Sequence, residues 1–211
     1  MKKIVIAFLL SCVFFKMSAQ DLKTFEPFIR KNFPEFIKHF KLKNFDNFKS
    51  NGEKKINFTE DSLDLTNYTF KEWNEYIKLY KPFLDYNSSK DFYIDLYSSK
   101  VGLRKKNRKY YGSYDADSEL KLGIVKNHKT YKLSSSGPSG AFVEAKWVDN
   151  EMAIILAYSE IGYRDFCPSI YILDLKNKTL IYYSDEKNLA DSFYQNKKSK
   201  PKIYEDLEDD N

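Results

Sequence analysis

The sequence predicts an α+β fold in which N-terminal short helices pack on a C-terminal antiparallel β-meander of about eight strands, forming a curved sheet or a small sandwich. Before residue 81, apolar residues recur at three- and four-residue intervals, which is the period of amphipathic helices. After residue 90, short segments rich in Val, Ile, Tyr and Phe alternate with polar turns, which is typical of strands. No helix-length segment separates them, so an antiparallel arrangement is expected.

The composition is that of one globular domain. The chain has 211 residues, of which 42% are hydrophobic, 31% charged and 17% aromatic. These values allow a single core and exclude a collagen-like or low-complexity protein. We expect one domain over residues 20–196, mainly helical over 20–90 and β-rich over 91–184. The charged tail, residues 197–211, has a basic half and an acidic half, and we expect it to be disordered.

Residues 1–19 have the features of a secretory signal peptide. Two lysines precede an apolar stretch, Ile4–Phe15, and Ser18-Ala19 supply small residues for cleavage. The apolar stretch is shorter than the roughly 20 residues that a membrane-spanning helix needs. We therefore expect an exported protein, periplasmic or secreted, without a transmembrane segment in the mature chain.

A lipid anchor is the alternative form of export. Leu9-Leu10-Ser11-Cys12 resembles the lipobox of bacterial lipoproteins, in which the lipidated cysteine becomes the mature N-terminus. The residues that follow Cys12 are still apolar, whereas a lipoprotein usually becomes polar there, so cleavage after Ala19 is the simpler interpretation. An anchor through Cys12 would change the attachment to the membrane and not the fold.

The charge argues against nucleic acid as a partner. The signal carries three lysines and no acid, so its removal lowers the formal charge from +5 to +2. The chain has only four arginines, although Arg is the side chain preferred for bidentate recognition of phosphates and bases. Loss of Cys12 also leaves Cys167 as the single cysteine, so no intramolecular disulfide is expected.

Phenylalanine and isoleucine recur at helical spacing over residues 21–48. Pro27 and Pro34 fit the first turns of helices better than helix interiors. We therefore predict two short helices with a break near Lys31–Phe33. A short strand is expected around Lys54–Phe58.

A better-marked helix is predicted over Phe70–Tyr80. Thr69 and Glu72 have the spacing of a capping box, in which each side chain accepts a hydrogen bond from the other residue's backbone N–H. Pro82 then ends the helix.

The β-rich part should contain short strands joined by hairpins. Strands are expected at Phe92–Tyr97, Lys109–Tyr114, Leu120–Val125, Thr130–Leu133, Ala141–Val148, Met152–Tyr158, Ser169–Leu173 and Thr179–Tyr183. Tight connections are expected at Asn127-His128, Asp149-Asn150 and Lys176-Asn177.

No catalytic residue, cofactor or metal site is predicted. His39, His128 and Cys167 are too few and too scattered for a zinc site, and Cys167 precedes a proline in an expected loop instead of opening a helix. The Gly137–Ala141 segment superficially resembles a serine nucleophile elbow, but a strand-like pattern follows it where a helix is required. Asp115, Asp117 and Glu119 read as an ordinary acidic turn, because the glycine of a calcium loop is missing.

The strongest candidate for binding is a basic and aromatic cluster. It comprises Arg104, Lys105, Lys106, Arg108, Lys109, Tyr110 and Tyr111. Such a cluster can bind a polyanion, such as an acidic glycan, a lipid headgroup or an acidic protein face, although it can also be a solvated connection between strands. Ser139 lies in a Ser- and Gly-rich segment that could form a binding loop on the sheet.

These features favour an exported binding protein over an enzyme. We expect its partner to be an envelope protein or an acidic polymer, and an immunity or inhibitor protein is one concrete form of this function. The alternative is a cell-envelope glycan-binding protein or a glycoside hydrolase. Its paired carboxylates would come from Glu144, Glu160 or Asp165, which lie near expected strand ends.

Overall fold

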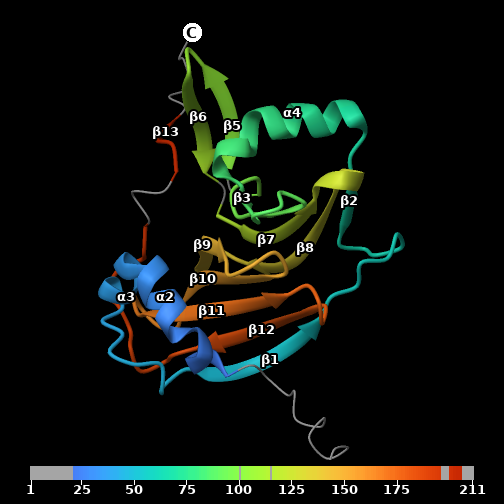
Figure 1. Cartoon of the computed structure of the whole chain (residues 1–211). Coiled ribbons are helices and arrows are strands. Elements are labelled where there is room, and N and C mark those ends of the chain that lie inside the picture. Colours follow the sequence, from blue (N-terminus) through green and yellow to red (C-terminus); the bar gives the residue numbers. More distant parts are fainter. Residues whose placement is uncertain (1–20, 100, 115, 196–199, 206–211) are drawn as a thin grey trace, which may run out of the picture.

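The computed structural model, shown in Figure 1, describes residues 21–99, 101–114, 116–195 and 200–205. The expected signal peptide, residues 1–19, lies outside the described residues, and so does Cys12. In the part of the chain that is described, no helix is both long enough and apolar enough to cross a membrane.

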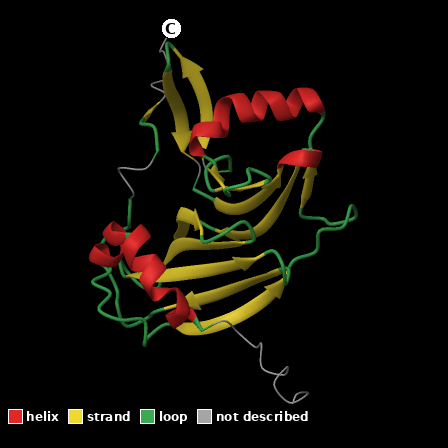
Figure 2. Ribbon diagram, in the orientation of Figure 1, coloured by secondary structure: helices red, strands yellow, loops and turns green. Residues whose placement is uncertain are grey.

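The described strands form three sheets, drawn as yellow arrows in Figure 2. The first sheet contains, in spatial order, β1 (Lys49–Lys55), β12 (Thr179–Ser184), β11 (Phe166–Asp174), β10 (Met152–Glu160) and β9 (Gly140–Trp147). The second sheet contains β2 (Leu65–Asn67), β8 (Lys129–Ser136), β7 (Ser118–Ile124), β4 (Phe92–Asp95) and β3 (Asp85–Tyr86). The third sheet contains β13 (Ile203–Glu205), β6 (Lys109–Tyr114) and β5 (Val101–Lys106).

Helices cover the outer faces of the first two sheets. The short N-terminal helices η1 (Leu22–Phe25), α2 (Glu26–Asn32) and α3 (Pro34–His39) pack on the first sheet. Helix α4 (Phe70–Tyr80) packs on the second sheet, and it lies at the top of the molecule in Figure 1. The inner faces of the two sheets pack on each other. These layers confirm the predicted α+β fold, and they form a sandwich.

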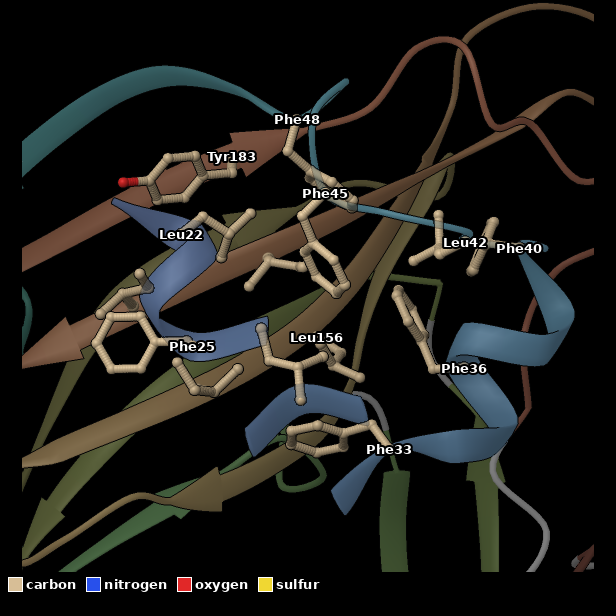
Figure 3. Packing of buried hydrophobic residues seen from close by; sticks show 14 of the residues in the cluster. Leu22, Phe25, Phe33, Phe36, Phe40, Leu42, Phe45, Phe48, Leu156 and Tyr183 are labelled. Atoms are coloured by element: carbon tan, nitrogen blue, oxygen red, sulfur yellow. The ribbon is translucent and has the colours of Figure 1, made fainter. Parts of the chain in front are cut away.

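The N-terminal helices are built around phenylalanine. Helix α2 ends at Asn32 and α3 begins at Pro34, so the predicted break is confirmed, because proline suits a first turn and cannot donate a backbone hydrogen bond. Phe33 and Phe36 are 1% and 0% exposed. Figure 3 shows Phe33 and Phe36 on either side of the view around Leu156 of the first sheet, and Phe40 of the segment that follows α3 beside Leu42.

The inner strands of the first sheet, such as β10, are buried on both faces. In β10, Ile154 and Leu156 face the N-terminal helices, while Ile155 faces the second sheet. All three side chains are 0% exposed. Successive side chains of a strand point to opposite faces, so a continuous apolar run is the pattern expected of a strand covered on both sides.

Helix α4 begins and packs as the sequence predicts. Thr69 accepts a hydrogen bond from the backbone N–H of Glu72, and Glu72 accepts one from that of Thr69. The buried side of the helix places Trp73 and Tyr76 against Tyr93 of β4. The capping box therefore fixes the start of a helix whose aromatic residues cover the second sheet.

Four described strands, β2, β3, β5 and β13, were not predicted. β2, β3 and β13 have two or three residues each, too few for a two-residue period to be visible. β13 lies in the tail that was expected to be disordered, so that expectation is wrong for residues 203–205. β5 contains the basic cluster, whose charges conceal the alternation.

β1 is an edge strand made of polar residues. All seven of its residues are exposed, and it pairs antiparallel with β12. The strand begins five residues earlier than the predicted strand at Lys54–Phe58, and the two share only Lys54 and Lys55. An exposed edge with several charged side chains resists pairing with other chains.

We predict that a side chain at position 123 would displace the ring of Tyr93, so that only glycine fits there. Gly123 of β7 pairs with Tyr93 of β4, and a Cβ atom on Gly123 would lie 1.8 Å from Cζ of Tyr93. Because Tyr93 is fully buried, we expect Gly123→Ala to lower the free energy of unfolding by about 2 kcal/mol. Urea denaturation followed by circular dichroism measures this change.

Gly137→Ala is the matched control. No atom lies within 4 Å of the Cβ position at Gly137, so we expect a change of less than about 0.5 kcal/mol. Equal unfolding midpoints for the two variants would contradict the tight packing of Tyr93 on Gly123.

Candidate functional site

Most of the predicted binding residues lie on the β5–β6 hairpin, which extends from the body of the molecule beside α4 (Figure 1). Asn107 and Arg108 form its turn, with φ values of 51° and 64°. Two successive residues with positive φ are typical of a two-residue turn whose twist matches that of the strands. The basic segment that could have been a solvated connection is therefore the turn end of a hairpin, with residues in both strands.

One face of this hairpin is apolar and attaches it to the molecule. Val101, Leu103 and Tyr110 are buried against Phe83 of the 3-10 helix η2 (Lys81–Phe83). The hydroxyl of Tyr80 in α4 also donates a hydrogen bond to the carbonyl of Val101, at 2.8 Å. These contacts fix the orientation of the hairpin.

The opposite face carries basic and aromatic residues. Because side chains alternate along a strand, Arg104, Lys106, Lys109 and Tyr111 share the face that points away from Phe83. The guanidinium carbon of Arg104 lies 5.8 Å from the centroid of the Tyr111 ring, within the range of a cation–π interaction.

β13 extends this face with residues from the end of the described chain. It pairs parallel with β6, placing Tyr204 beside Tyr111, and the two ring centroids are 5.7 Å apart. The ammonium groups of Lys109 and Lys202 lie 5.3 and 4.7 Å from the centroid of Tyr204. We call the resulting surface the basic–aromatic face: Arg104, Lys106, Lys109, Tyr111, Lys202 and Tyr204.

The positive charges of this face are close together. Lys106 and Lys109 are directly opposite each other in the register of β5 and β6, an arrangement that is destabilising for like charges. Among the described residues, no carboxylate lies within the 4.0 Å ion-pair distance of Lys106, Lys109 or Lys202. An anion bound to this face would relieve the repulsion.

The remaining predicted binding residues lie outside the basic–aromatic face. Lys105 lies on the apolar side of the hairpin, with its ammonium 4.9 Å from the centroid of Tyr110. Arg108 is in the turn. Ser139 is in the loop between β8 and β9, where its carbonyl accepts a hydrogen bond from the backbone N–H of Glu160. The contacts of Ser139 are thus with β10 and not with the hairpin.

A largely but not fully buried ion pair lies just before β13. The ammonium of Lys200 is 2.6 Å from a carboxylate oxygen of Asp85 in β3. The two side chains are only 15% and 21% exposed. Burial raises the pKa of Asp85 above its ordinary value, whereas the charge of Lys200 and its hydrogen bond lower it. This pair joins the C-terminal segment to the second sheet.

The three carboxylates considered for glycoside hydrolysis have separate local contacts. Glu144 of β9 accepts a hydrogen bond from the hydroxyl of Tyr194. Glu160 accepts one from the backbone N–H of Arg164, at 3.0 Å, and Asp165 lies in the same β10–β11 connection. These are contacts of a strand and of a turn, so they do not strengthen the hydrolase alternative.

The histidines and the cysteine are also dispersed. His39 contacts the carbonyl of Ser192 at 2.9 Å, and His128 stacks on Trp73 with a centroid distance of 5.1 Å. The prediction of a loop at Cys167 is wrong, because Cys167 lies in β11 and is 1% exposed. Within the described ranges, no group of three or more His, Cys, Asp or Glu residues could hold a metal ion.

The predicted acidic turn is only partly described, because Asp115 lies outside the described residues. Glu119 lies in β7, where its carboxylate pairs with Lys121 at 3.0 Å and with Lys132 at 3.5 Å. Neutralisation of Glu119 by two lysines fits the interpretation of an ordinary surface segment.

Sequence reasoning missed a buried acid beneath α4. Asp95 is 1% exposed and accepts hydrogen bonds from the hydroxyl of Tyr76, at 2.8 Å, and from the backbone N–H groups of Tyr97 and Ser98. Burial and the adjacent Asp95 raise the pKa of Tyr76. These bonds satisfy the carboxylate, so Asp95 serves the packing of α4 on the second sheet.

Comparison with known proteins adds no functional information. No protein family, no curated protein and no solved structure matches this chain. The argument for function therefore depends on the residues of the basic–aromatic face.

We predict that the Cys167 thiol is inert in the folded protein. Burial raises its pKa to about 11, so roughly one thiol in a thousand is ionised at about pH 8, and only the thiolate is nucleophilic. In a Cys12→Ser variant, labelling with a disulfide reagent should be roughly 100-fold slower in buffer than in urea. Equal rates under the two conditions would contradict the burial of Cys167.

Proposed function

We propose that this chain is an exported binding protein that recognises an acidic region of another protein through the basic–aromatic face. The proposal of export is supported by residues 1–19, which have the sequence features of a signal peptide. The observation that supports binding is the gathering of Arg104, Lys109 and Lys202 over two tyrosine rings. Lys106 adds a fourth positive charge opposite Lys109.

The chemistry of this face suits carboxylates. Lysine and arginine form charge-assisted hydrogen bonds with carboxylates, which are stronger than bonds between neutral groups. The phenolic hydroxyls of Tyr111 and Tyr204 add donors without charge. The repulsion between Lys106 and Lys109 is present before binding and is relieved by an acidic ligand, which favours the complex over the free protein.

The supporting structure keeps the face ready for binding. Val101, Leu103 and Tyr110 hold the hairpin against Phe83, and pairing with β13 adds a third strand. A preformed surface loses less conformational entropy when it binds than a flexible one does. An immunity or inhibitor protein, which must bind its target tightly, is one function consistent with such a surface.

Two observations favour an acidic protein over an acidic glycan or a nucleic acid. Cations lie over the rings of Tyr111 and Tyr204, so these rings are partly covered and are poor platforms for stacking sugars or bases. In addition, Arg104 is the single arginine of the face, whereas arginine dominates the recognition of phosphates and bases.

We predict that neutralising two lysines of this face weakens binding to an acidic peptide. The probe is a short fluorescein-labelled oligoglutamate peptide, and its affinity is measured by fluorescence anisotropy at low salt. We expect Lys106→Gln/Lys109→Gln to reduce the affinity about tenfold, and added salt to weaken binding by the wild-type protein, because screening acts on exposed charges.

Lys49→Gln/Lys176→Gln is the matched control, because it removes two exposed charges from the first sheet and its adjoining turn. Its affinity for the peptide should stay close to that of the wild-type protein. Equal losses in both variants, no binding by the wild-type protein, or a preference for polygalacturonate over the peptide would overturn the proposal.

A further inference from the structure

We infer that Asp85 is a positioning residue for the basic–aromatic face, because its ion pair with Lys200 holds β13 on β6 and so places Lys202 and Tyr204 in that face. This inference rests on the proposed function, since it concerns how the same surface is assembled. It assigns a role to a buried carboxylate that lies outside the surface itself.

Asp85 is held by both large sheets. As part of β3, it pairs with Ile94 of β4 in the second sheet. Its backbone carbonyl accepts a hydrogen bond of 2.7 Å from the indole N–H of Trp147, which belongs to β9 of the first sheet. The carboxylate of Asp85 therefore presents a fixed attachment point to Lys200.

The attachment depends on both partners, because burial alone disfavours the ionised carboxylate of Asp85 and Lys200 opposes that effect. Removing one partner of a buried pair leaves an uncompensated charge, which is strongly unfavourable. Lys200 and, from β9, Lys146 lower the pKa of Asp85, whereas burial and Asp95 of β4 raise it. Since Lys200 favours the ionised carboxylate, docking of Lys200 should weaken as the pH falls through the pKa of Asp85.

Among the described residues, the other contacts of β13 are mainly with the β5–β6 hairpin itself. It pairs with β6 through only three residues. Ile203 packs on the cluster around Phe83, but it is only partly buried. A single three-residue strand gains little from pairing alone, so the ion pair two residues before Lys202 supplies a second attachment.

Release of this attachment would change the face directly. Tyr111 would lose its ring neighbour, Tyr204, and Lys109 would lose the ring over which its ammonium lies. Lys202 would leave the face together with Tyr204, because the two contact each other. The face would then keep only the residues that belong to the β5–β6 hairpin.

The test uses the full chain with Asp85→Asn and Lys200→Met, separately and combined. The first readout is hydrogen exchange of the backbone amides of residues 203–205, which requires no ligand. The second is the affinity for the oligoglutamate peptide. We expect both single variants to increase exchange and to weaken peptide binding about tenfold, and the double variant to be no worse than either one, because both disrupt a single interaction.

The sign of the charge change separates a loss of position from a general electrostatic effect on peptide binding. Asp85→Asn makes the protein more positive, so weaker binding of an acidic peptide by this variant can be explained only by loss of position. Lys126→Met, which removes an exposed lysine from the 3-10 helix η3 (Val125–Asn127), is the control for Lys200→Met and should bind nearly as the wild-type protein does. Lys200→Arg keeps the charge and should preserve both readouts.

The two proposals fail in distinguishable ways. If the wild-type protein does not bind the peptide, the proposed function fails, while hydrogen exchange still reports whether Asp85 holds β13. Unchanged exchange in Lys200→Met would overturn the positioning role, and so would faster exchange with unchanged peptide affinity. Circular dichroism and the unfolding midpoint identify any variant that fails to fold, and Lys200→Met, at the margin of the fold, keeps the test decisive.

Discussion

Burial of the inner strands of the first sheet on both faces is the constraint on which the rest of the structure depends. Strand β10, in the interior of that sheet, has no face free for solvent, so both of its sides need a covering layer. Phenylalanine-rich helices supply one layer and the second sheet supplies the other. Each large apolar side chain buried in this way contributes about 1.5–3 kcal/mol. The interior is thus occupied by packing, and the proposed binding surface lies at the periphery.

The third sheet combines attachment to the molecule with the surface proposed for recognition. One side of the β5–β6 hairpin is apolar and packs on Phe83, while the other side collects positive charge. Strand alternation alone separates these two roles within six residues of each strand. β13 then adds to the charged side although it is far away in the sequence. The surface is therefore a joint product of a local hairpin and a distant segment.

Features that depend on neighbouring residues could be predicted from the sequence, whereas contacts between distant segments could not. Pro34 marks the break between α2 and α3, and the Thr69–Glu72 pair marks the start of α4, because each depends only on neighbouring residues. The hairpin residues of the candidate site were also found from their composition. Lys202 and Tyr204 were missed, since a short charged segment gives no indication that it pairs with β6. Asp95 was missed because its partners come from other elements.

The pairing of β1 with β12 has a consequence for how the chain folds. The two strands lie side by side in the first sheet, yet most of the chain separates them in sequence. Closing so large a loop costs entropy before any contact compensates for it, and domains rich in such distant pairings reach the native state slowly. Until β12 is in place, β1 has no partner strand, so its many charges also protect the nascent chain from association with its neighbours.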